Sequence, residues 1–258
     1  MARGLLNDVS NWALGAIFLG AAIVVALAGS ALLRRVAPGW RDLQASQVVV
    51  GVAAMAMTLF AVVLAFVVVT LYGGYQSAVT AVGAEASALG GIVRDAQAFP
   101  ASDQRRINTA ATGYAAEVRT REFALMRNGR EDPEARRLLN DLFEMMQRYS
   151  PATETQRTFY GLASDRLSTV ADERQKRLQA AETAIPGPLA ALILITALVT
   201  LATTLLLKTH HPAADIALVV SVAVMIAAGL VTALILEYPF SGSIAVPSTP
   251  FGHVSAGG

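Results

Sequence analysis

Three threonines spaced four residues apart carry the first chemical pattern in this sequence. Thr196, Thr200 and Thr204 lie within an apolar run and would share one face of a helix, which gives a row of three hydroxyl groups. Such a row can donate hydrogen bonds to a permeating anion or to water in a pore. Each hydroxyl can also bond the carbonyl four residues earlier or a neighbouring helix, which is the plainer interpretation.

Other residue types that support catalysis or metal binding do not form a recognised site. The sequence has no cysteine, which removes thiolate metal sites, disulfides and thiol nucleophiles. It also lacks a phosphate-binding glycine loop and the His-Glu-x-x-His and Gly-x-Ser-x-Gly motifs. We interpret the adjacent His210 and His211 as solvated spacers, and the carboxylate pair Glu131/Asp132 as solvated surface. We therefore expect no enzyme activity, no catalytic residue, no metal and no cofactor.

Arg174 and Arg177 are three residues apart and would share a helix face about two turns before the apolar run that starts at Pro186. At that level they would meet lipid phosphates or guide anions toward a vestibule. Contact with lipid is the plainer of these two interpretations.

The amino-acid composition indicates the surroundings in which these residues lie. The chain has 258 residues, of which 54% are hydrophobic and 15% charged, with a mean hydropathy of +0.50, well outside the average of soluble domains. The charges are segregated, because 15 of the 20 Lys and Arg and 15 of the 19 Asp and Glu lie between Gln76 and Thr183. A net charge of +1 without a basic patch makes nucleic acid an unlikely partner. The expected surroundings are a lipid bilayer.

Four uncharged runs are long enough to span that bilayer. Ala13 to Leu33 alone would form a helix of about 31 Å. The run exceeds the apolar core of a signal peptide, although Ala26-Leu27-Ala28 resembles a cleavage site. A retained helix is favoured over a signal peptide. The four predicted spans are residues 13–33, 48–71, 186–207 and 216–236.

An even number of spans puts both termini and the central segment on one side of the membrane. The predicted organisation is a pair of transmembrane helices in residues 1–75, an extramembrane helical bundle in 76–183, a second pair in 184–237 and a tail in 238–258. Aromatic rings prefer the headgroup level, and Trp12 and Tyr72 mark one interface while Trp40 marks the other. The distribution of Lys and Arg does not decide which side is cytoplasmic.

The central segment reads as helix throughout, with breaks at Pro100, Asn128-Gly129 and Ser150-Pro151. Asp132 followed by Pro133 is typical of a helix start. With the continuation of the second span and a helix from Pro151 toward Glu182, four antiparallel helices are expected. Two apolar stripes would face their core: Ile107, Ala111, Tyr114, Val118 and Leu125, and Leu138, Leu142, Met146 and Tyr149. The tail is predicted to be ordered against the bundle through Phe240, Ile244, Val246 and Phe251.

Short motifs over nearly the whole chain carry a family resemblance. They are Glu85-Ala86, Arg94-Asp95-Ala96 with Pro100, Arg174 to Leu178 leading to Pro186, and the distinctive Tyr238-Pro239-Phe240-Ser241-Gly242. With these motifs the sequence resembles the bestrophin-like family of bacterial membrane proteins, also known as a DUF4239 domain. The candidate family-motif residues are Glu85, Arg94, Asp95, Arg174, Arg177, Tyr238, Pro239, Phe240 and Gly242.

The resemblance implies kinship with bestrophin anion channels, which are pentamers with a cytosolic helical part between spans two and three. Bestrophins line a narrow neck with bulky apolar side chains at four-residue spacing on span two. The corresponding candidates here are Phe60, Leu64 and Val68, to which Thr196, Thr200 and Thr204 are added as candidate pore-lining residues. The acidic calcium clasp of animal bestrophins has no clear counterpart in this chain.

The leading functional hypothesis is a passive, anion-conducting homo-oligomer in the bacterial inner membrane, with the central segment and termini in the cytoplasm. Its spans contain no interior carboxylate or His, which disfavours coupled transport. The alternative is a membrane-anchored sensor or scaffold whose central four-helix segment binds a ligand or partner. Small anions are the expected partners in the first case.

Overall fold

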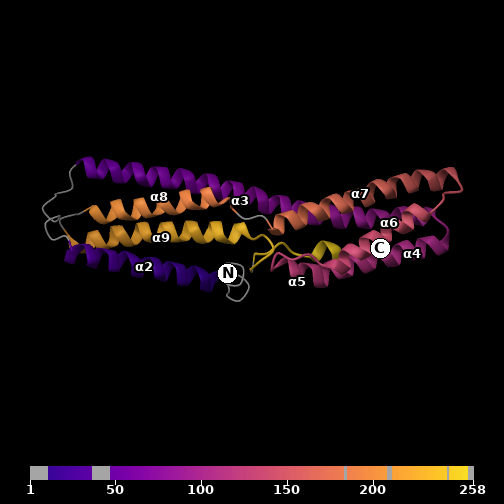
Figure 1. Ribbon diagram of the computed structural model, residues 1–258, viewed down its shortest axis with the longest axis horizontal. Helices are drawn as coiled ribbons and strands as arrows, with labels where there is room; N and C mark the ends of the chain where they lie inside the picture. Colours follow the sequence, from indigo (N-terminus) through magenta and orange to yellow (C-terminus); the bar gives the residue numbers. More distant parts are fainter. Residues whose placement is uncertain (1–10, 37–46, 183–184, 208–210, 243, 255–258) are drawn as a thin grey trace. The chain divides into compact units, whose positions relative to one another are not determined.

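The computed structural model describes residues 11–36, 47–182, 185–207, 211–242 and 244–254. Every regular element in these ranges is helical, so the predicted all-α fold is confirmed (Figure 1). The long helices are α2 (Asn11–Val36), α3 (Gln47–Asp95), α4 (Ala101–Glu117), α6 (Pro133–Arg148), α7 (Glu154–Glu182), α8 (Gly187–Leu206) and α9 (Pro212–Glu237). The short helical turns are η2 (Ala96–Ala98), η3 (Val118–Glu122), α5 (Phe123–Met126) and η4 (Thr249–His253).

The chain divides into two compact units. We call them the apolar unit, Asp8–Tyr72 with Ala184–Glu237, and the polar unit, Met1–Asn7 with Gly73–Thr183 and Tyr238–Gly258. Helix α3 contributes residues to both units, which confirms the prediction that the second apolar run continues as a helix. Within the described residues, four helices are long and apolar enough to cross a membrane, as predicted.

The apolar unit contains α2, the first part of α3, α8 and α9. Phe60 and Val67 of α3 pack against Ile193 and Ala197 of α8, and a second small core joins Ala26 of α2 to residues of α9. Gly229 of α9 lies under Leu64, because a Cβ added there would stand 2.4 Å from Leu64 Cδ2. No more than 28% of the apolar window of any of the four spans is buried within the protein. The remaining apolar surface therefore needs lipid or further copies around it.

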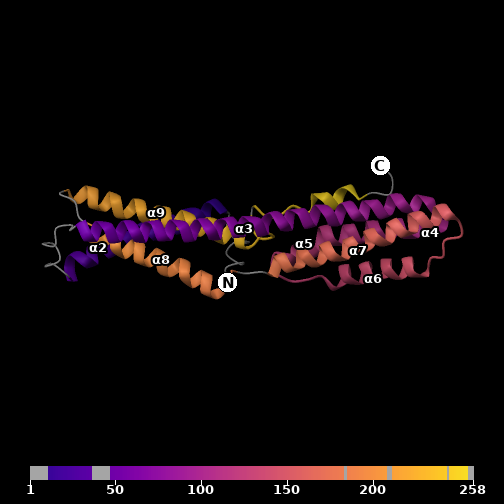
Figure 2. The ribbon, with the colours of Figure 1, turned by 90° about the horizontal axis from the view of Figure 1, so that it is seen from above.

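The polar unit is a bundle of antiparallel helices (Figures 1 and 2). They are the last part of α3; α4, which η3 and α5 extend; α6; and α7. Asp132 caps α6, since its Oδ1 accepts a hydrogen bond of 3.1 Å from the backbone N–H of Glu134, with Pro133 in the first turn. Gly129 turns the chain after α5 with a φ of 66°, a conformation that suits glycine. The predicted breaks and the start of α6 are confirmed.

One stretch of this bundle departs from the predicted register. Val118–Glu122 forms a π-helical turn, η3, between α4 and α5. Such a turn contains one extra residue, so the residues after it rotate relative to the preceding stripe. Met126 is therefore buried where the sequence pattern predicted Leu125, which is only half-buried.

The C-terminal segment packs on the polar unit. Phe240, Val246 and Phe251 are buried in its core, as predicted, but Ile244 is 55% exposed and that part of the prediction is wrong. A bond of 2.8 Å from the Val246 N–H to the Pro239 carbonyl folds the segment back on itself and turns the Ile244 region outward.

Some predictions concern residues that the structure does not describe. Trp40, Lys208 and His210 lie outside the described residues, as does the side chain of Trp12. The boundaries of the membrane and the interface role of these residues remain predictions.

Candidate functional site

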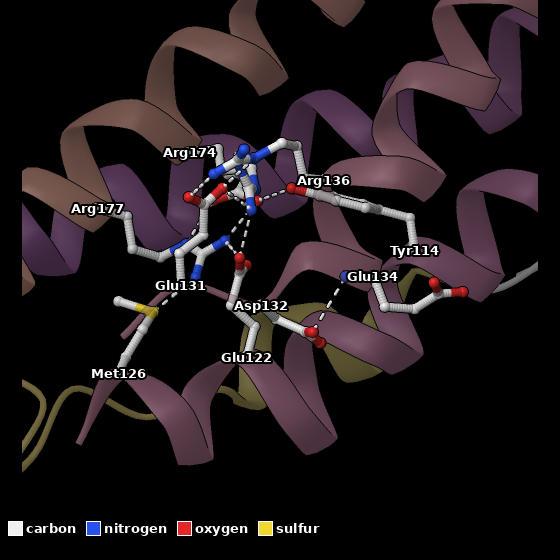
Figure 3. A network of polar contacts seen from close by, with 10 residues as sticks. Tyr114, Glu122, Met126, Glu131, Asp132, Glu134, Arg136, Arg174 and Arg177 are labelled. Carbon is white, nitrogen blue, oxygen red and sulfur yellow. Dashed lines mark hydrogen bonds and ion pairs between the residues drawn. The ribbon is translucent and has the colours of Figure 1, made fainter. Parts of the chain in front are cut away.

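Buried charges meet in the middle of the polar unit. Glu85 of α3, Glu122 at the end of η3 and Arg177 of α7 are each 0% exposed, and Arg174 is 6% exposed. Figure 3 shows Glu122, Arg174 and Arg177 with their charged groups close together. Ionised side chains are rarely buried to this extent unless they are paired. Their placement follows from the helices, because each occupies a position on the apolar stripe of its own element.

Arg177 is the centre of this cluster. Its Nε donates to Glu85 Oε2 at 2.7 Å, and its Nη2 donates to Glu85 Oε1 at 3.0 Å and to Glu122 Oε2 at 2.7 Å. Its Nη1 lies 2.8 Å from Met126 Sδ. One guanidinium thus joins α7 to α3 and to η3, and its planar fork matches the geometry of a carboxylate.

Aromatic side chains complete the surroundings of Arg177. The rings of Phe123 and Phe251 have their centroids 5.4 and 5.7 Å from the guanidinium carbon, within the range of cation–π attraction. The hydroxyl of Tyr114 donates to Glu85 Oε1 at 2.6 Å. Burial raises the pKa of Tyr114 well above its ordinary value, and the negative charge of Glu85 adds to this, so the phenol keeps its proton and remains a donor.

Arg174 extends the cluster toward the surface. Its Nη2 donates to Glu122 Oε1 at 2.5 Å and to Glu131 Oε1 at 3.0 Å. Glu131 also accepts from Arg136, whose Nε lies 2.8 Å from Glu131 Oε1. The group Glu85, Glu122, Glu131, Arg136, Arg174 and Arg177, which we call the charge cluster, contains three acids and three bases.

Electrostatics keep the buried bases of this cluster ionised. Burial alone would lower the pKa of Arg177, but attraction by Glu85 and Glu122 outweighs it and the pKa is raised. The pKa of Arg174 is likewise raised against the effect of burial, chiefly by Glu122. Fixed cations of this kind do not exchange protons at neutral pH, so the cluster is suited to holding helices together rather than to acid–base catalysis.

These positions correct the expectation for Arg174 and Arg177. They do share a face of α7, as predicted, but that face points into the bundle and both guanidinium groups are bound to carboxylates. Neither side chain is available to lipid phosphates or to passing anions. The interpretation of Glu131 and Asp132 as solvated surface is also wrong, because Glu131 is paired within the cluster and Asp132 is a buried helix cap.

The other family-motif residues serve separate contacts. Asp95 is buried and pairs with Arg166, which crosses over Gly91 of α3, whereas the neighbouring Arg94 is exposed and does not join the cluster. In the tail, Ser241 Oγ donates to the Arg127 carbonyl at 2.8 Å, and Gly242 has a φ of 80°. The Tyr238-Pro239-Phe240-Ser241-Gly242 motif thus forms the turn that seats the tail.

Sequence reasoning missed Tyr114 as a polar partner, Glu122 and Met126. A signal for Glu122 was present, because it falls four residues after Val118 and continues the stripe of Ile107, Ala111 and Tyr114. An acidic residue on an apolar stripe indicates a buried charge that needs a partner. Arg174 and Arg177 continue the buried face of α7 in the same way, after Leu167 and Val170.

The candidate pore residues lie in the apolar unit. Thr196 bonds the carbonyls of Leu192 and Ile193, and Thr204 bonds that of Thr200 at 2.7 Å. Thr200 donates instead to the Ala56 carbonyl of α3 at 3.1 Å. In this structure all three hydroxyls are bound within the subunit, as the plainer interpretation expected.

The candidate pore-lining stripe on α3, which is Phe60, Leu64 and Val68, is partly covered by other helices of the same subunit. Phe60 is 7% exposed and Leu64 is half-buried, both against α8 or α9, and Val68 is half-buried. A different face of α3 is open. It carries six exposed apolar side chains whose spacing alternates between three and four residues, which we call the open stripe: Val52, Met55, Leu59, Val62, Phe66 and Val69.

No group of three His, Cys, Asp or Glu that could hold a metal ion occurs among the residues that the structure describes. This agrees with the charge cluster, in which each acid is already bound to a guanidinium.

Similarity to known proteins extends over most of the chain. The family described as the Bestrophin-like domain matches residues 20–251. A crystal structure of a point-mutated bacterial bestrophin homologue from Klebsiella pneumoniae superposes with a TM-score of 0.73 at 14% identity, covering 96% of both chains. A second point-mutated form of a bestrophin homologue from the same organism gives a TM-score of 0.70 at 17% identity, covering 93% of this chain and 97% of the other. No functionally curated protein matches the sequence. With the family match extending over most of its length, this chain belongs to the bestrophin-like family.

Proposed function

We propose that this protein is the subunit of a passive, anion-conducting channel formed by several copies of the chain in the cell membrane. Membership of the bestrophin-like family and the likeness to bacterial bestrophin homologues support this proposal. The central segment and both termini would face the cytoplasm, as the resemblance implies.

The open stripe on α3 is the observation that carries the proposal. Its six side chains lie on one face of a membrane helix, and Met55 and Phe66 are 75% and 65% exposed. A repeat of three and four residues is typical of a helix that packs beside copies of itself, and a ring of such helices encloses a passage with an apolar constriction. The face opposite the subunit's own packing is therefore the better candidate for pore lining than Phe60 and Leu64.

The chemistry of the spans favours passive conduction. From Val49 to Leu71 and from Gly187 to Leu206 the sequence has no Asp, Glu, Lys, Arg or His. Carriers that couple transport to protons or sodium ions usually need an ionisable group at this depth. An apolar passage instead conducts by wetting, with selectivity set at its ends or by backbone and hydroxyl groups.

Flux into liposomes tests the proposal. Purified protein should carry chloride and nitrate at a rate above that of empty vesicles. Leu59→Ala should raise this rate, because it shortens a side chain at the constriction. The matched control is Leu198→Ala on α8, which removes the same type of side chain from another exposed position, 68% against 55% exposed, and should leave the rate unchanged.

Assembly gives the second readout. A particle image of the detergent-purified protein should show a ring with α3 nearest its axis. Absence of flux above empty vesicles, or a monomer without a continuous path, would overturn the channel proposal.

A further inference from the structure

Two carboxyl groups meet where α4 ends and α6 begins. Glu117 is the last residue of α4, and Asp132 is the residue directly before α6. The Glu117 side chain lies within hydrogen-bonding reach of Asp132, which is only 2% exposed. Two ionised carboxylates this close repel each other, and burial strengthens the repulsion. We call these two residues the carboxyl pair, and neither of them belongs to the charge cluster.

One oxygen of each carboxyl group lacks a donor. Glu117 Oε1 and Asp132 Oδ2 are both buried, and neither has a hydrogen-bond partner among the described residues. The other oxygen of Asp132 accepts from the Glu134 N–H and caps α6. A buried acceptor without a donor is costly, and an ionised carboxylate can only accept. A proton between the two carboxyl groups supplies the missing donor and removes one of the two negative charges.

The charged groups around Glu117 do not replace this proton. Arg121 of η3 has its Nη1 3.2 Å from Glu117 Oε1, but not in hydrogen-bonding geometry, and its side chain is 66% exposed. Such exposed pairs contribute little. Glu134 of α6 adds negative charge, although its own carboxylate binds Arg137. Helix η4 of the tail also packs against α4 and carries an exposed histidine, His253.

Glu117 is the member of the pair that is suited to hold the proton. Partial burial and the hydrogen bond with Asp132 raise the pKa of Glu117 above its ordinary value of 4.5, and the attraction of Arg121 does not cancel these effects. The N-terminus of α6 favours negative charge on Asp132, the residue that caps it. A hydrogen bond from the protonated Glu117 to the Asp132 carboxylate satisfies both side chains.

We propose that Glu117 and Asp132 share one proton, and that this proton fastens the start of α6 to the end of α4. When the proton is lost as the pH rises, two negative charges face each other and this corner of the bundle loosens. The corner adjoins the charge cluster on both sides, because Glu122 lies in η3, which follows α4 directly, and Glu131 immediately precedes Asp132. The carboxyl pair thus makes the packing of the polar unit sensitive to pH, independently of ion conduction.

Hydrogen–deuterium exchange of the full-length protein in detergent tests the proposal at the first turn of α6. Because the pKa of Glu117 is raised in the folded state, its stabilisation is complete below 4.5 and is lost as the pH rises through the raised value. After correction for the intrinsic pH dependence of exchange, opening of this turn should increase by up to about tenfold per pH unit over that interval. Measurements above pH 4.5 avoid the titration of Glu131, whose pKa is lowered.

Two variants remove the proton's binding site and keep the shape of the corner. Glu117→Gln is neutral at every pH, so opening of the first turn of α6 should no longer increase as the pH rises. Asp132→Asn should behave in the same way, and asparagine remains a good helix cap. Unchanged melting of Glu117→Gln at pH 4.5 would show that this variant folds.

Infrared spectroscopy detects the proton itself. Just above pH 4.5, the difference spectrum between the wild type and Glu117→Gln should contain the carbonyl band of a protonated carboxylic acid. Asp132→Asn should lose this band, because its amide can donate to an ionised Glu117. Glu144→Gln is the matched control, since it removes an acid of α6 that pairs with Arg148 on the surface. It should keep both the band and the pH dependence of exchange.

The proposal is overturned if opening of the first turn of α6 is independent of pH above 4.5 in the wild type, or if Glu117→Gln keeps the dependence. A difference spectrum without the carboxylic acid band would also overturn it. So would a pH profile that changes on addition of EDTA, because a metal ion rather than a proton would then lie between the carboxylates. None of these measurements depends on flux, so failure here and failure of the channel proposal are distinguishable.

Discussion

Arg177 and Glu85 are 92 residues apart in the sequence, and their side chains meet in two parallel hydrogen bonds of 2.7 and 3.0 Å with neither exposed to solvent. The pair joins α7 to α3, and Glu122 binds the same guanidinium from η3. A buried ion pair contributes modest net stability compared with an apolar replacement, but loss of one partner leaves a buried charge unmatched. The charge cluster therefore fixes which helices of the polar unit pack together.

Replacing Arg177 should be strongly destabilising. Arg177→Gln leaves Glu85 and Glu122 buried without their cation, and breaking a buried pair in this way costs about 3–5 kcal/mol. We expect a large drop in the melting temperature of the purified protein. Arg137→Gln is the control, because Arg137 forms pairs with Glu134 and Asp141 on the exposed face of α6. Equal melting temperatures of the two variants would contradict the role given to the cluster.

The hydroxyl of Tyr114 should contribute a separate, smaller amount. Tyr114→Phe keeps the buried ring but removes the 2.6 Å hydrogen bond to Glu85. A hydrogen bond to a charged group contributes about 1.5–3 kcal/mol, so the variant should melt below the wild type and above Arg177→Gln. Chemical unfolding followed by circular dichroism measures the difference. A neutral effect of Tyr114→Phe would mean that Glu85 is satisfied without it.

The helical order of this protein could be predicted from the spacing of its apolar residues and from the segregation of its charges along the chain. Four apolar runs, the breaks at Pro100 and Gly129 and the cap at Asp132 each depend on residues close together in the chain. Such local signals are read directly from one sequence. The helical order of the polar unit followed from them.

The partners of the buried charges were not readable in the same way. Glu122 lies on the apolar stripe that the sequence shows, but its partner Arg177 is 55 residues further along the chain, and that pairing depends on how α7 packs against η3. The pairing of Glu85 with Arg177 depends on the packing of helices distant in sequence. The family motifs included Glu85, Arg174 and Arg177. The two arginines were expected to contact lipid phosphates or anions, but they are buried and bind carboxylates within the bundle.

Two adjacent glycines of α3 should respond in opposite directions. A Cβ at Gly91 would stand 2.4 Å from Arg166 Cδ, so Gly91→Ala pushes aside the side chain that pairs with buried Asp95. Nothing lies within 4 Å of a Cβ at Gly90, and there alanine brings only its higher helix propensity, about 1 kcal/mol. We expect Gly90→Ala to raise the melting temperature and Gly91→Ala to lower it. If both substitutions raised the melting temperature, Arg166 would be able to pair with Asp95 in a different side-chain conformation.

Acid should weaken the outer part of the charge cluster through Glu131. Hydrogen bonds from Arg136, and further those from Arg174, hold the pKa of Glu131 below its ordinary value of 4.5 against the opposing effect of burial. Its stabilising contribution is therefore complete above that ordinary value and is lost as the pH falls through the lowered pKa of the folded state. Melting temperatures of the wild type and Glu131→Gln should differ at pH 7 and converge toward pH 3. A constant difference over this range would exclude Glu131 as the titrating group.

The tail offers the last test, because its residues differ sharply in burial. Phe251 is 2% exposed and lies against Phe123 and the Arg177 guanidinium, whereas Ile244 is 55% exposed in the same segment. Phe251→Ala removes a buried ring at a cost of about 3–5 kcal/mol and uncovers one side of the charge cluster. The variant should melt well below the wild type, and deletion of the residues after Glu237 should be at least as harmful. Ile244→Ala is the control and should melt with the wild type. A deletion that purifies with unchanged melting would mean that the bundle holds its charges without the tail.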